Sequence, residues 1–351
     1  MTMPLFETIT RRSVATPRLI ASVLERAAPP GSRTVVFIHG NVSSSLFWQP
    51  TMLALPADVR GLAIDLRGFG DSETLPVDAT RGLGDFADDV ASVLGELGIG
   101  RAHLVGWSMG GGVVLQYLLT HPETVSGVTL VSPVSPYGFG GTAGSDGRLL
   151  TTDAAGTGGG GANPDFVARL ADGDTSADAP TSPRSVYRAA YVLAAADLPA
   201  EDVWVESMLS TKTGEGNYPG DAAPSENWPG FSPGGRGVLN TMAPTHFNVA
   251  GIVNLETKPG ILWIRGLDDA IVSDASLFDL NHLGSLGVIP GWPGPEAAPA
   301  QPMIQQTRAV LDAYRAAGGT YREVALPACG HSPHLEHPDR FAAELGKEIT
   351  P

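Results

Sequence analysis

The residues with the clearest chemical potential are a serine, a few aspartates and a histidine that lie far apart along the chain. Ser108 stands in AHLVGWSMGGGVVLQYLL, residues 102–119, between one apolar run and a second apolar run at helical spacing. A serine hydroxyl is a weak nucleophile near neutral pH and attacks only when a base lies within hydrogen-bond reach. If Ser108 is a nucleophile, the chain must also supply a histidine as base and an acid that orients the histidine.

The surroundings of Ser108 predict a sharp turn from a strand into a helix. Residues 102–108 have the pattern of a buried strand, and the residues from 109 up to Pro122 have that of a helix. Gly106 and Gly110 lack Cβ atoms, so the strand end and the helix start can approach closely around a strained Ser108. With 44 glycines among 351 residues, the letters G-x-S-x-G carry little weight by themselves. Their place between a strand and a helix is what indicates a nucleophile elbow.

His331 is the best placed base among the eight histidines. It follows LPACG directly after the predicted strand 320–328, at the carboxyl edge of the sheet, where active-site groups gather in open α/β folds. The orienting acid is expected just after the predicted strand 260–266, where Asp268, Asp269 and Asp274 occur. From position alone, one of the first two should accept the imidazole N–H.

A metal site is the rival interpretation of the same loop, because His331, His334 and His337 occur together in HSPHLEHP. Pro333 and Pro338 disfavour one regular helix that presents all three, and the H-E-x-x-H spacing is absent. We therefore expect no metal and no other cofactor.

The elements that must position these residues alternate between strand and helix. Apolar runs at 33–40, 60–66, 102–108, 125–133 and 260–266 predict buried strands, and the apolar stripe of 83–100 predicts an amphipathic helix. Residues 13–27 predict an antiparallel strand pair. This rhythm predicts an α/β fold with a mostly parallel sheet and helices on both faces. It breaks at about Pro133, so we expect a core of residues 1–133 and 258–351 and an inserted lid at 134–257.

Composition excludes several functional classes. The formal net charge of −15 disfavours binding to nucleic acids or anionic membranes. The single cysteine, Cys329, rules out an intrachain disulfide. The arginine pair near the N-terminus is not followed by an uninterrupted apolar segment, and no window resembles a membrane helix. The expectation is a cytoplasmic protein, and nothing in the sequence indicates an oligomeric state.

Taken together, these motifs resemble the α/β-hydrolase-fold family, in its order of nucleophile, acid and histidine. The resemblance covers residues 34–132 and 260–348. In that family the acid often occupies G-x-x-D-x-x-V, here Gly266, Asp269 and Val272, so the resemblance assigns the acid to Asp269 and keeps Asp268 in reserve. IHGNVSSSLFW resembles the loop of the oxyanion hole, which implies backbone N–H donors at Asn41 and Met109. A serine at position 108 disfavours the dehalogenase and epoxide hydrolase branches, which use aspartate.

The resemblance implies a cofactor-independent serine hydrolase that acts on a small molecule with an apolar portion. We expect a carboxylic ester or lactone as substrate. The alternatives are carbon–carbon bond hydrolysis of a diketone by the same residues, haloperoxidase side activity, and a non-catalytic small-molecule receptor. Apolar or amphipathic residues of the irregular segments are candidates for the substrate pocket: Tyr137, Phe139, Trp204, Met208, His246, Phe247 and Trp292.

Overall fold

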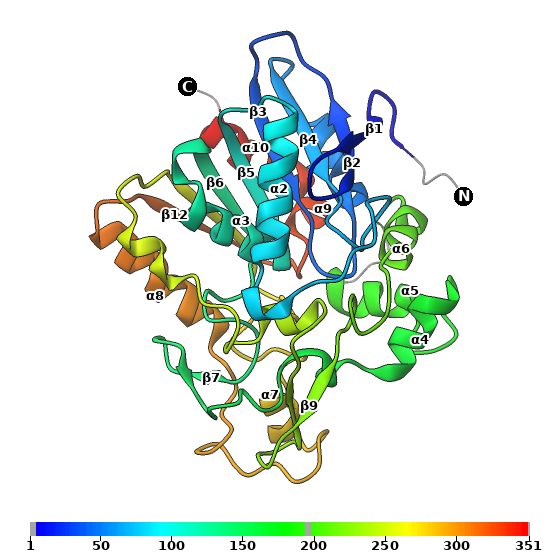
Figure 1. The fold of residues 1–351 in the computed structure, drawn as a ribbon, viewed down its shortest axis with the longest axis vertical. Coiled ribbons are helices and arrows are strands. Elements are labelled where there is room, and N and C mark those ends of the chain that lie inside the picture. Colours follow the sequence, from blue (N-terminus) through cyan, green and yellow to red (C-terminus); the bar gives the residue numbers. More distant parts are fainter. Residues whose placement is uncertain (1–4, 194–197, 350–351) are drawn as a thin grey trace.

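An eight-stranded sheet forms the centre of the protein (Figure 1). The computed structural model describes residues 5–193 and 198–349. The strand order is β1-β2-β4-β3-β5-β6-β11-β12. β1 and β2 form an antiparallel pair, β2 is antiparallel to β4, and the other neighbours are parallel. The strands are β1 Thr10–Ala15, β2 Ile20–Arg26, β3 Arg33–Ile38, β4 Val59–Ile64, β5 Ala102–Trp107, β6 Val125–Val131, β11 Ile261–Gly266 and β12 Tyr321–Leu326. The predicted mostly parallel α/β architecture and the N-terminal strand pair are confirmed.

Helices cover both faces of this sheet. α2 and α3 lie side by side in front of it in Figure 1, and α10 lies behind it. α2 buries Phe86, Val90 and Val93 against the sheet, which is the apolar stripe that the sequence predicts. The helices of this core are α1 Gln49–Leu53, α2 Gly84–Glu96, α3 Met109–Thr120, α8 Met303–Ala316, α9 Pro333–Glu336 and α10 Pro338–Ile349.

A long excursion joins β6 to β11 and lies below the sheet in Figure 1. Its elements are β7 Thr142–Ala143, β8 Arg148–Leu149, α4 Pro164–Asp172, α5 Pro183–Val186, α6 Glu201–Leu209, β9 Ala222–Pro224 and β10 Phe231–Pro233. A second irregular segment between β11 and α8 carries α7 Leu280–Ser285 on the same side. β6 ends at Val131 and β11 begins at Ile261, and the division into a core and a lid at 134–257 stays a prediction. None of the helices within the described ranges combines the length and the apolarity that crossing a membrane requires.

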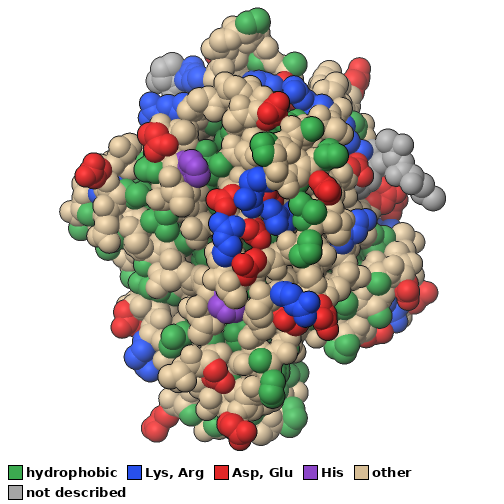
Figure 2. Space-filling model, viewed as in Figure 1, with side chains coloured by type: hydrophobic (Ala, Val, Ile, Leu, Met, Phe, Trp, Pro, Cys, Tyr) green, Lys and Arg blue, Asp and Glu red, His purple; other side chains and the backbone are tan. Residues whose placement is uncertain are grey.

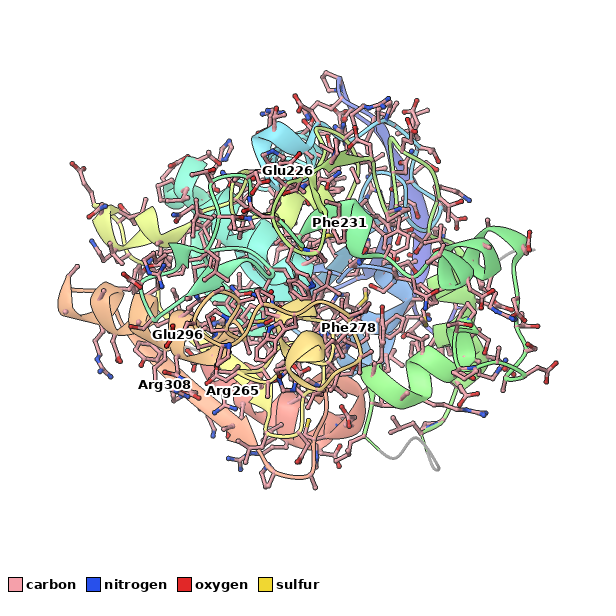
Figure 3. The ribbon with its side chains drawn as sticks, turned by 90° about the horizontal axis from the view of Figure 1, so that it is seen from below. Glu226, Phe231, Arg265, Phe278, Glu296 and Arg308 are labelled. Atoms are coloured by element: carbon pink, nitrogen blue, oxygen red, sulfur yellow. The ribbon has the colours of Figure 1, made fainter. Side chains whose placement is uncertain are left out.

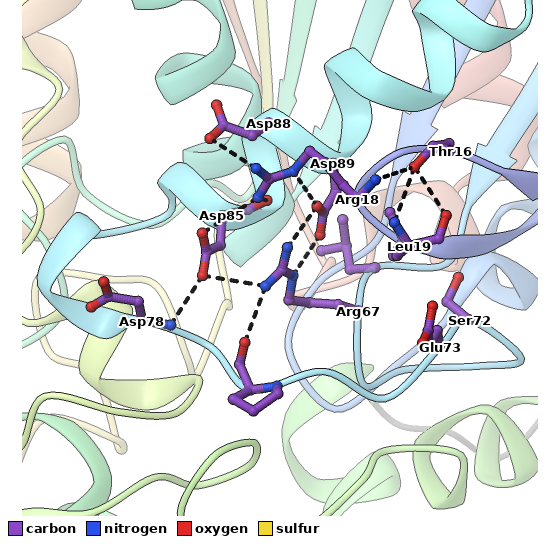
Figure 4. Close-up of polar contacts among 12 residues, drawn as sticks. Thr16, Arg18, Leu19, Arg67, Ser72, Glu73, Asp78, Asp85, Asp88 and Asp89 are labelled. Carbon is purple, nitrogen blue, oxygen red and sulfur yellow. Dashed lines mark hydrogen bonds and ion pairs between the residues drawn. The ribbon is translucent and has the colours of Figure 1, made fainter.

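A buried ion-pair network fixes the loop after β4 to α2 (Figure 4). The Arg67 guanidinium donates to both oxygens of Asp89 at 2.5 and 2.7 Å, to Asp85 at 3.3 Å and to the Pro76 carbonyl at 3.0 Å. Arg18 donates to Asp89 as well, at 2.7 Å. Because these charges are paired and hydrogen-bonded, burial does not leave any of them uncompensated. Arg67 therefore braces this loop. On the face shown in Figure 2, acidic and basic side chains lie beside one another, including a mixed group near its middle.

Candidate active site

Ser108 occupies the turn between β5 and α3 in a strained conformation. Its φ of 57° and ψ of −121° lie in a region that residues with a Cβ rarely adopt. A Cβ on Gly106 would lie 2.2 Å from the Gly110 carbonyl oxygen, and a Cβ on Gly110 would lie 2.4 Å from the backbone oxygens of Ile38 and His39. Both glycines are therefore required by close backbone approach, as the sequence predicts. The Ser108 N–H donates to the Val131 carbonyl at 2.9 Å, so the turn is also held by β6.

His331 and Asp269 come together at the carboxyl ends of β12 and β11. His331 Nδ1 lies 2.8 Å from Asp269 Oδ2, and both side chains are buried. The other carboxylate oxygen of Asp269, Oδ1, accepts the backbone N–H groups of Ile271 at 2.8 Å and Val272 at 2.9 Å. A carboxylate accepts hydrogen bonds, so His331 carries its proton on Nδ1 and keeps Nε2 free to act as a base.

The two other aspartates of this loop face elsewhere. Asp268 is exposed, and its backbone N–H donates to the Cys329 carbonyl at 3.0 Å. The Asp274 carboxylate accepts the Ile304 N–H at 2.8 Å at the start of α8. The structure thus brings Asp269, and not its neighbours, to His331. The backbone of His331 is held too, because Trp107 Nε1 donates to its carbonyl oxygen at 2.8 Å.

The two positions expected to supply the oxyanion hole flank Ser108 on different loops. Met109 is the first residue of α3, where backbone N–H groups have no partner within the helix. Asn41 lines the same cavity as Ser108, and its carbonyl oxygen accepts the Tyr191 hydroxyl at 3.0 Å. A Cβ on Gly40 would lie 3.0 Å from the Ser108 Cβ, so the loop of Asn41 passes directly beside the serine.

A cavity of about 450 Å³ opens at Ser108 and His331. Its walls come from the excursion after β6 and from the segment after β11. Apart from Ser108, Asn41 and His331, its lining includes Val42, Trp107, Val134, Phe139, Gly140, Thr157, Gly161, Asn163, Phe166, Val186, Tyr191, Tyr218, Leu239, Met242, Ile271, Val272, Leu277, Phe278, Asp279, Leu280 and Leu283. Most of these side chains are apolar, which suits an apolar ligand.

Of the aromatic and amphipathic residues expected in the pocket, Phe139 lines this cavity. The other six are not among its lining residues. Trp204 and Met208 are buried on α6, where Trp204 packs against Phe47 with ring centroids 5.3 Å apart. The remaining four make other contacts. Tyr137 packs against Gly147, and Phe247 belongs to the hydrophobic core. His246 Nδ1 lies within hydrogen-bond distance of the Asn240 carbonyl, and Trp292 Nε1 donates to the Ala298 carbonyl.

Three other histidines are buried and serve packing or backbone contacts. His39 Nε2 accepts the Leu66 N–H at 3.0 Å, and burial lowers the pKa of His39. His103 Nε2 lies 2.8 Å from the Thr129 hydroxyl, and burial lowers its pKa to about 4. His334 lies between Trp48 and Trp107, with ring centroids at 4.5 and 4.9 Å, and neither of its ring nitrogens has a hydrogen-bond partner among the described residues. No group of three possible metal ligands occurs within the described ranges.

Replacing His334 by phenylalanine is expected to stabilise the protein. Burial lowers the pKa of His334 to about 3, so the folded state keeps it neutral while the unfolded chain binds a proton below about pH 6.5. Stability is therefore lost as pH falls from about 6.5 towards 3, by up to about 1.4 kcal/mol per pH unit from this group. His334→Phe should gain about 1 kcal/mol at pH 7.5, where an unpartnered polar group disappears, and more at pH 5. Urea unfolding at both pH values measures this, and equal gains at both would contradict it.

Known proteins resemble this chain in sequence over part of its length and in fold over nearly all of it. Residues 33–191 match the family described as alpha/beta hydrolase fold. Carboxylesterase YbfK of Bacillus subtilis is 31% identical over 111 residues, which is 32% of this chain and 37% of that protein. The aligned stretch spans less than half of that relative. The solved structure of carboxylesterase CesB (YbfK) has a TM-score of 0.58 at 17% identity and covers 98% of this chain and 91% of that one. Esterase RhEst1 from Rhodococcus sp. ECU1013 has a TM-score of 0.57 at 20% identity, with 97% and 98% covered.

The sheet order, the strained serine after β5 and these likenesses define the class of protein: the chain has the α/β-hydrolase fold. Residues 33–191 are similar to the family of that name, which agrees with the motifs of the sequence.

Proposed function

We propose that this protein is a serine hydrolase that cleaves a carboxylic ester or lactone of an uncharged, largely apolar molecule. Ser108 Oγ attacks the carbonyl carbon while His331 Nε2 takes the hydroxyl proton, and Asp269 stabilises the imidazolium that forms. The N–H groups of Asn41 and Met109 donate to the oxyanion. His331 then returns the proton to the departing alcohol oxygen, which leaves an acyl-enzyme on Ser108. Water, deprotonated by His331, attacks that ester and releases the acid.

The observation that carries this proposal is the buried His331–Asp269 pair at 2.8 Å beside the cavity that Ser108 also lines. An ordinary strand-to-helix turn does not require a serine with a φ of 57°. The names of the relatives and structural neighbours, carboxylesterases and an esterase, agree with an ester hydrolase. They do not determine the substrate.

The charge of the cavity supports an uncharged substrate. No lysine or arginine occurs among its described lining residues. The one acid among the described lining residues is Asp279, whose carboxylate accepts the Gln301 N–H at 2.7 Å and the Asn281 N–H at 3.0 Å. Burial raises the pKa of Asp279. A substrate carboxylate would therefore be desolvated beside this acid without a cation to pair with, which is unfavourable.

The rim of the cavity is apolar as well. Leu277 and Phe278 line the cavity and are 50% and 44% exposed. Phe278 lies next to α7 on the side of the molecule that carries the excursion (Figure 3). An apolar rim that continues into an apolar cavity favours the entry of apolar esters.

A fluorophosphonate reagent, followed by peptide mapping, tests the nucleophile directly. We expect one modified residue, Ser108, and hydrolysis of uncharged p-nitrophenyl esters with a kcat/KM at least tenfold above that of an ester whose acyl chain ends in a carboxylate. A diketone panel run in parallel separates ester from carbon–carbon bond hydrolysis. No labelling and no turnover, together with tight binding of an apolar ligand, would contradict the proposal and favour a receptor.

A further inference from the structure

Glu336, on the short helix α9, makes an unusual set of contacts with the loop that carries His331. The Gly330 N–H lies 3.0 Å from each of its carboxylate oxygens, and the Ser332 N–H donates to Oε1 at 3.1 Å. These are the backbone amides immediately before and after His331. Hydrogen bonds from backbone N–H groups to a carboxylate are charge-assisted and stronger than neutral ones. One side chain therefore fixes the backbone on both sides of the proposed base.

The same carboxylate reaches the excursion after β6. Glu336 Oε2 accepts the Leu193 N–H at 2.6 Å. A Cβ on Gly330 would lie 3.0 Å from the Leu193 nitrogen and 3.3 Å from the Val192 carbonyl carbon, so this segment packs directly on the loop of His331. Two residues earlier, the Tyr191 hydroxyl donates to the carbonyls of Asn41 and Val42 at 3.0 and 3.2 Å. Residues 191–193 thus touch both the histidine loop and the expected oxyanion loop.

We propose that Glu336 is a positioning residue for His331, and that it couples the orientation of His331 to residues 191–193 of the excursion. The inference rests on the proposed function, in which His331 is the base. Asp269 fixes the imidazole through one ring nitrogen, and Trp107 holds the carbonyl of His331. Glu336 supplies the restraint on the two peptide groups that flank it. A rotation of those groups would shift the imidazole relative to Ser108, and misplacement of a catalytic group lowers the rate.

The reactivity of the Cys329 thiol can report on the mobility of this loop, because Cys329 is the single cysteine of the chain and lies two residues before His331. Its side chain is fully buried, and its Sγ lies 3.9 Å from Glu336 Oε1. Burial, with Glu336 as the next cause, raises the pKa of the Cys329 thiol, so the thiolate that reacts with disulfide reagents is scarce. Loosening of the loop should expose the thiol and raise its reactivity.

The test compares Glu336→Ala, Glu336→Gln and a control, Glu344→Gln. Glu344 is a buried glutamate of α10 that pairs with Arg322, Arg340 and Lys347. None of these three partners belongs to the His331 loop, so the Glu344 variant measures the effect of lost stability alone. For Glu336→Ala we expect kcat for an uncharged ester to fall at least tenfold with KM within threefold, and Cys329 to react with a chromogenic disulfide at least tenfold faster. Glu336→Gln keeps one oxygen for Gly330 and Ser332 and should fall between wild type and alanine. Glu344→Gln should retain the wild-type kcat and thiol reactivity.

Several outcomes would overturn the inference. Unchanged kcat in Glu336→Ala, with or without a lower melting temperature, would reduce Glu336 to a structural role. A rise in thiol reactivity without a loss of kcat would show that the loop loosens but that the position of His331 does not depend on it. If Glu336→Ala does not fold, kcat and the thiol reactivity of Cys329 are both measured on Glu336→Gln. Absence of esterase activity in the wild type would contradict the proposed function instead, while thiol reactivity would still report whether Glu336 holds the loop.

Discussion

Ser108→Ala is expected to lower kcat for ester hydrolysis by about 10⁴-fold or more and to abolish labelling by a fluorophosphonate. The variant lacks the oxygen that would form the acyl-enzyme, while the remaining groups can only bind and polarise the ester. Folding should change little, because alanine retains the Cβ that packs beside Gly40. Steady-state kinetics with an uncharged p-nitrophenyl ester and thermal unfolding measure the two effects. Turnover at a wild-type rate would show that Ser108 is not the nucleophile.

Ser108→Gly provides the matched comparison. At a φ of 57°, glycine removes the strain that serine and alanine both carry, at a saving of about 1–3 kcal/mol, partly offset by the greater freedom of glycine in the unfolded chain. The glycine variant should therefore be as inactive as the alanine variant but more stable than it. This result would show that the protein retains a strained backbone at Ser108 in order to present its hydroxyl. Equal melting temperatures for the two variants would contradict that interpretation.

The sheet and the residues at its edge were predictable because both depend on short, regular patterns. Apolar runs bounded by glycine or proline indicated the parallel strands, and the carboxyl ends of such strands meet at one edge of a sheet. Ser108 directly follows β5, whereas Asp269 lies three residues after β11 and His331 five residues after β12. The parallel strands bring these three loops to one edge of the sheet. Position alone left Asp268 and Asp269 open, and the resemblance to the family assigned the acid to Asp269. The structure brings Asp269 to His331, while the Asp268 side chain is exposed.

The cavity walls were less predictable because they belong to segments without periodicity. Large aromatic residues seemed natural candidates, yet Trp204 fills space between α6 and Phe47. The wall combines other large residues, such as Phe166 and Tyr218, with glycines such as Gly140 and Gly161. The missing side chains of these glycines give no signal in a sequence that holds 44 glycines. The contacts of Glu336 with the loop of His331 were not predictable from the sequence either. The sequence shows only that an acidic residue lies five positions after His331. The hydrogen bonds of that acid with the loop of His331 depend on how the chain folds around α9.

Asp269→Asn is expected to lower kcat by about 10³–10⁴-fold with little change in KM, because it forces the wrong tautomer on His331. Oδ1 of residue 269 accepts two backbone N–H groups, from Ile271 and Val272. An asparagine will keep its oxygen there, since turning the amide over would place its N–H₂ group against those two donors. The amide nitrogen then faces His331 Nδ1 and donates to it. His331 must accept on Nδ1 and carry its proton on Nε2, where it can no longer take the proton of Ser108.

Asp268→Asn is the matched control, because it makes the same chemical change one residue earlier on an exposed side chain. It should keep kcat within about threefold of wild type, as surface substitutions usually do little. Asp269→Gly, which leaves the Oδ2 position open, should regain part of its activity when formate is added, since a small carboxylate can accept the Nδ1 proton. Full activity in Asp269→Asn, or an equal loss in Asp268→Asn, would contradict the role of the 2.8 Å contact between Asp269 and His331. Because two backbone amides fix Oδ1 of Asp269 while Oδ2 faces His331, the backbone of the loop after β11 decides which ring nitrogen of His331 donates.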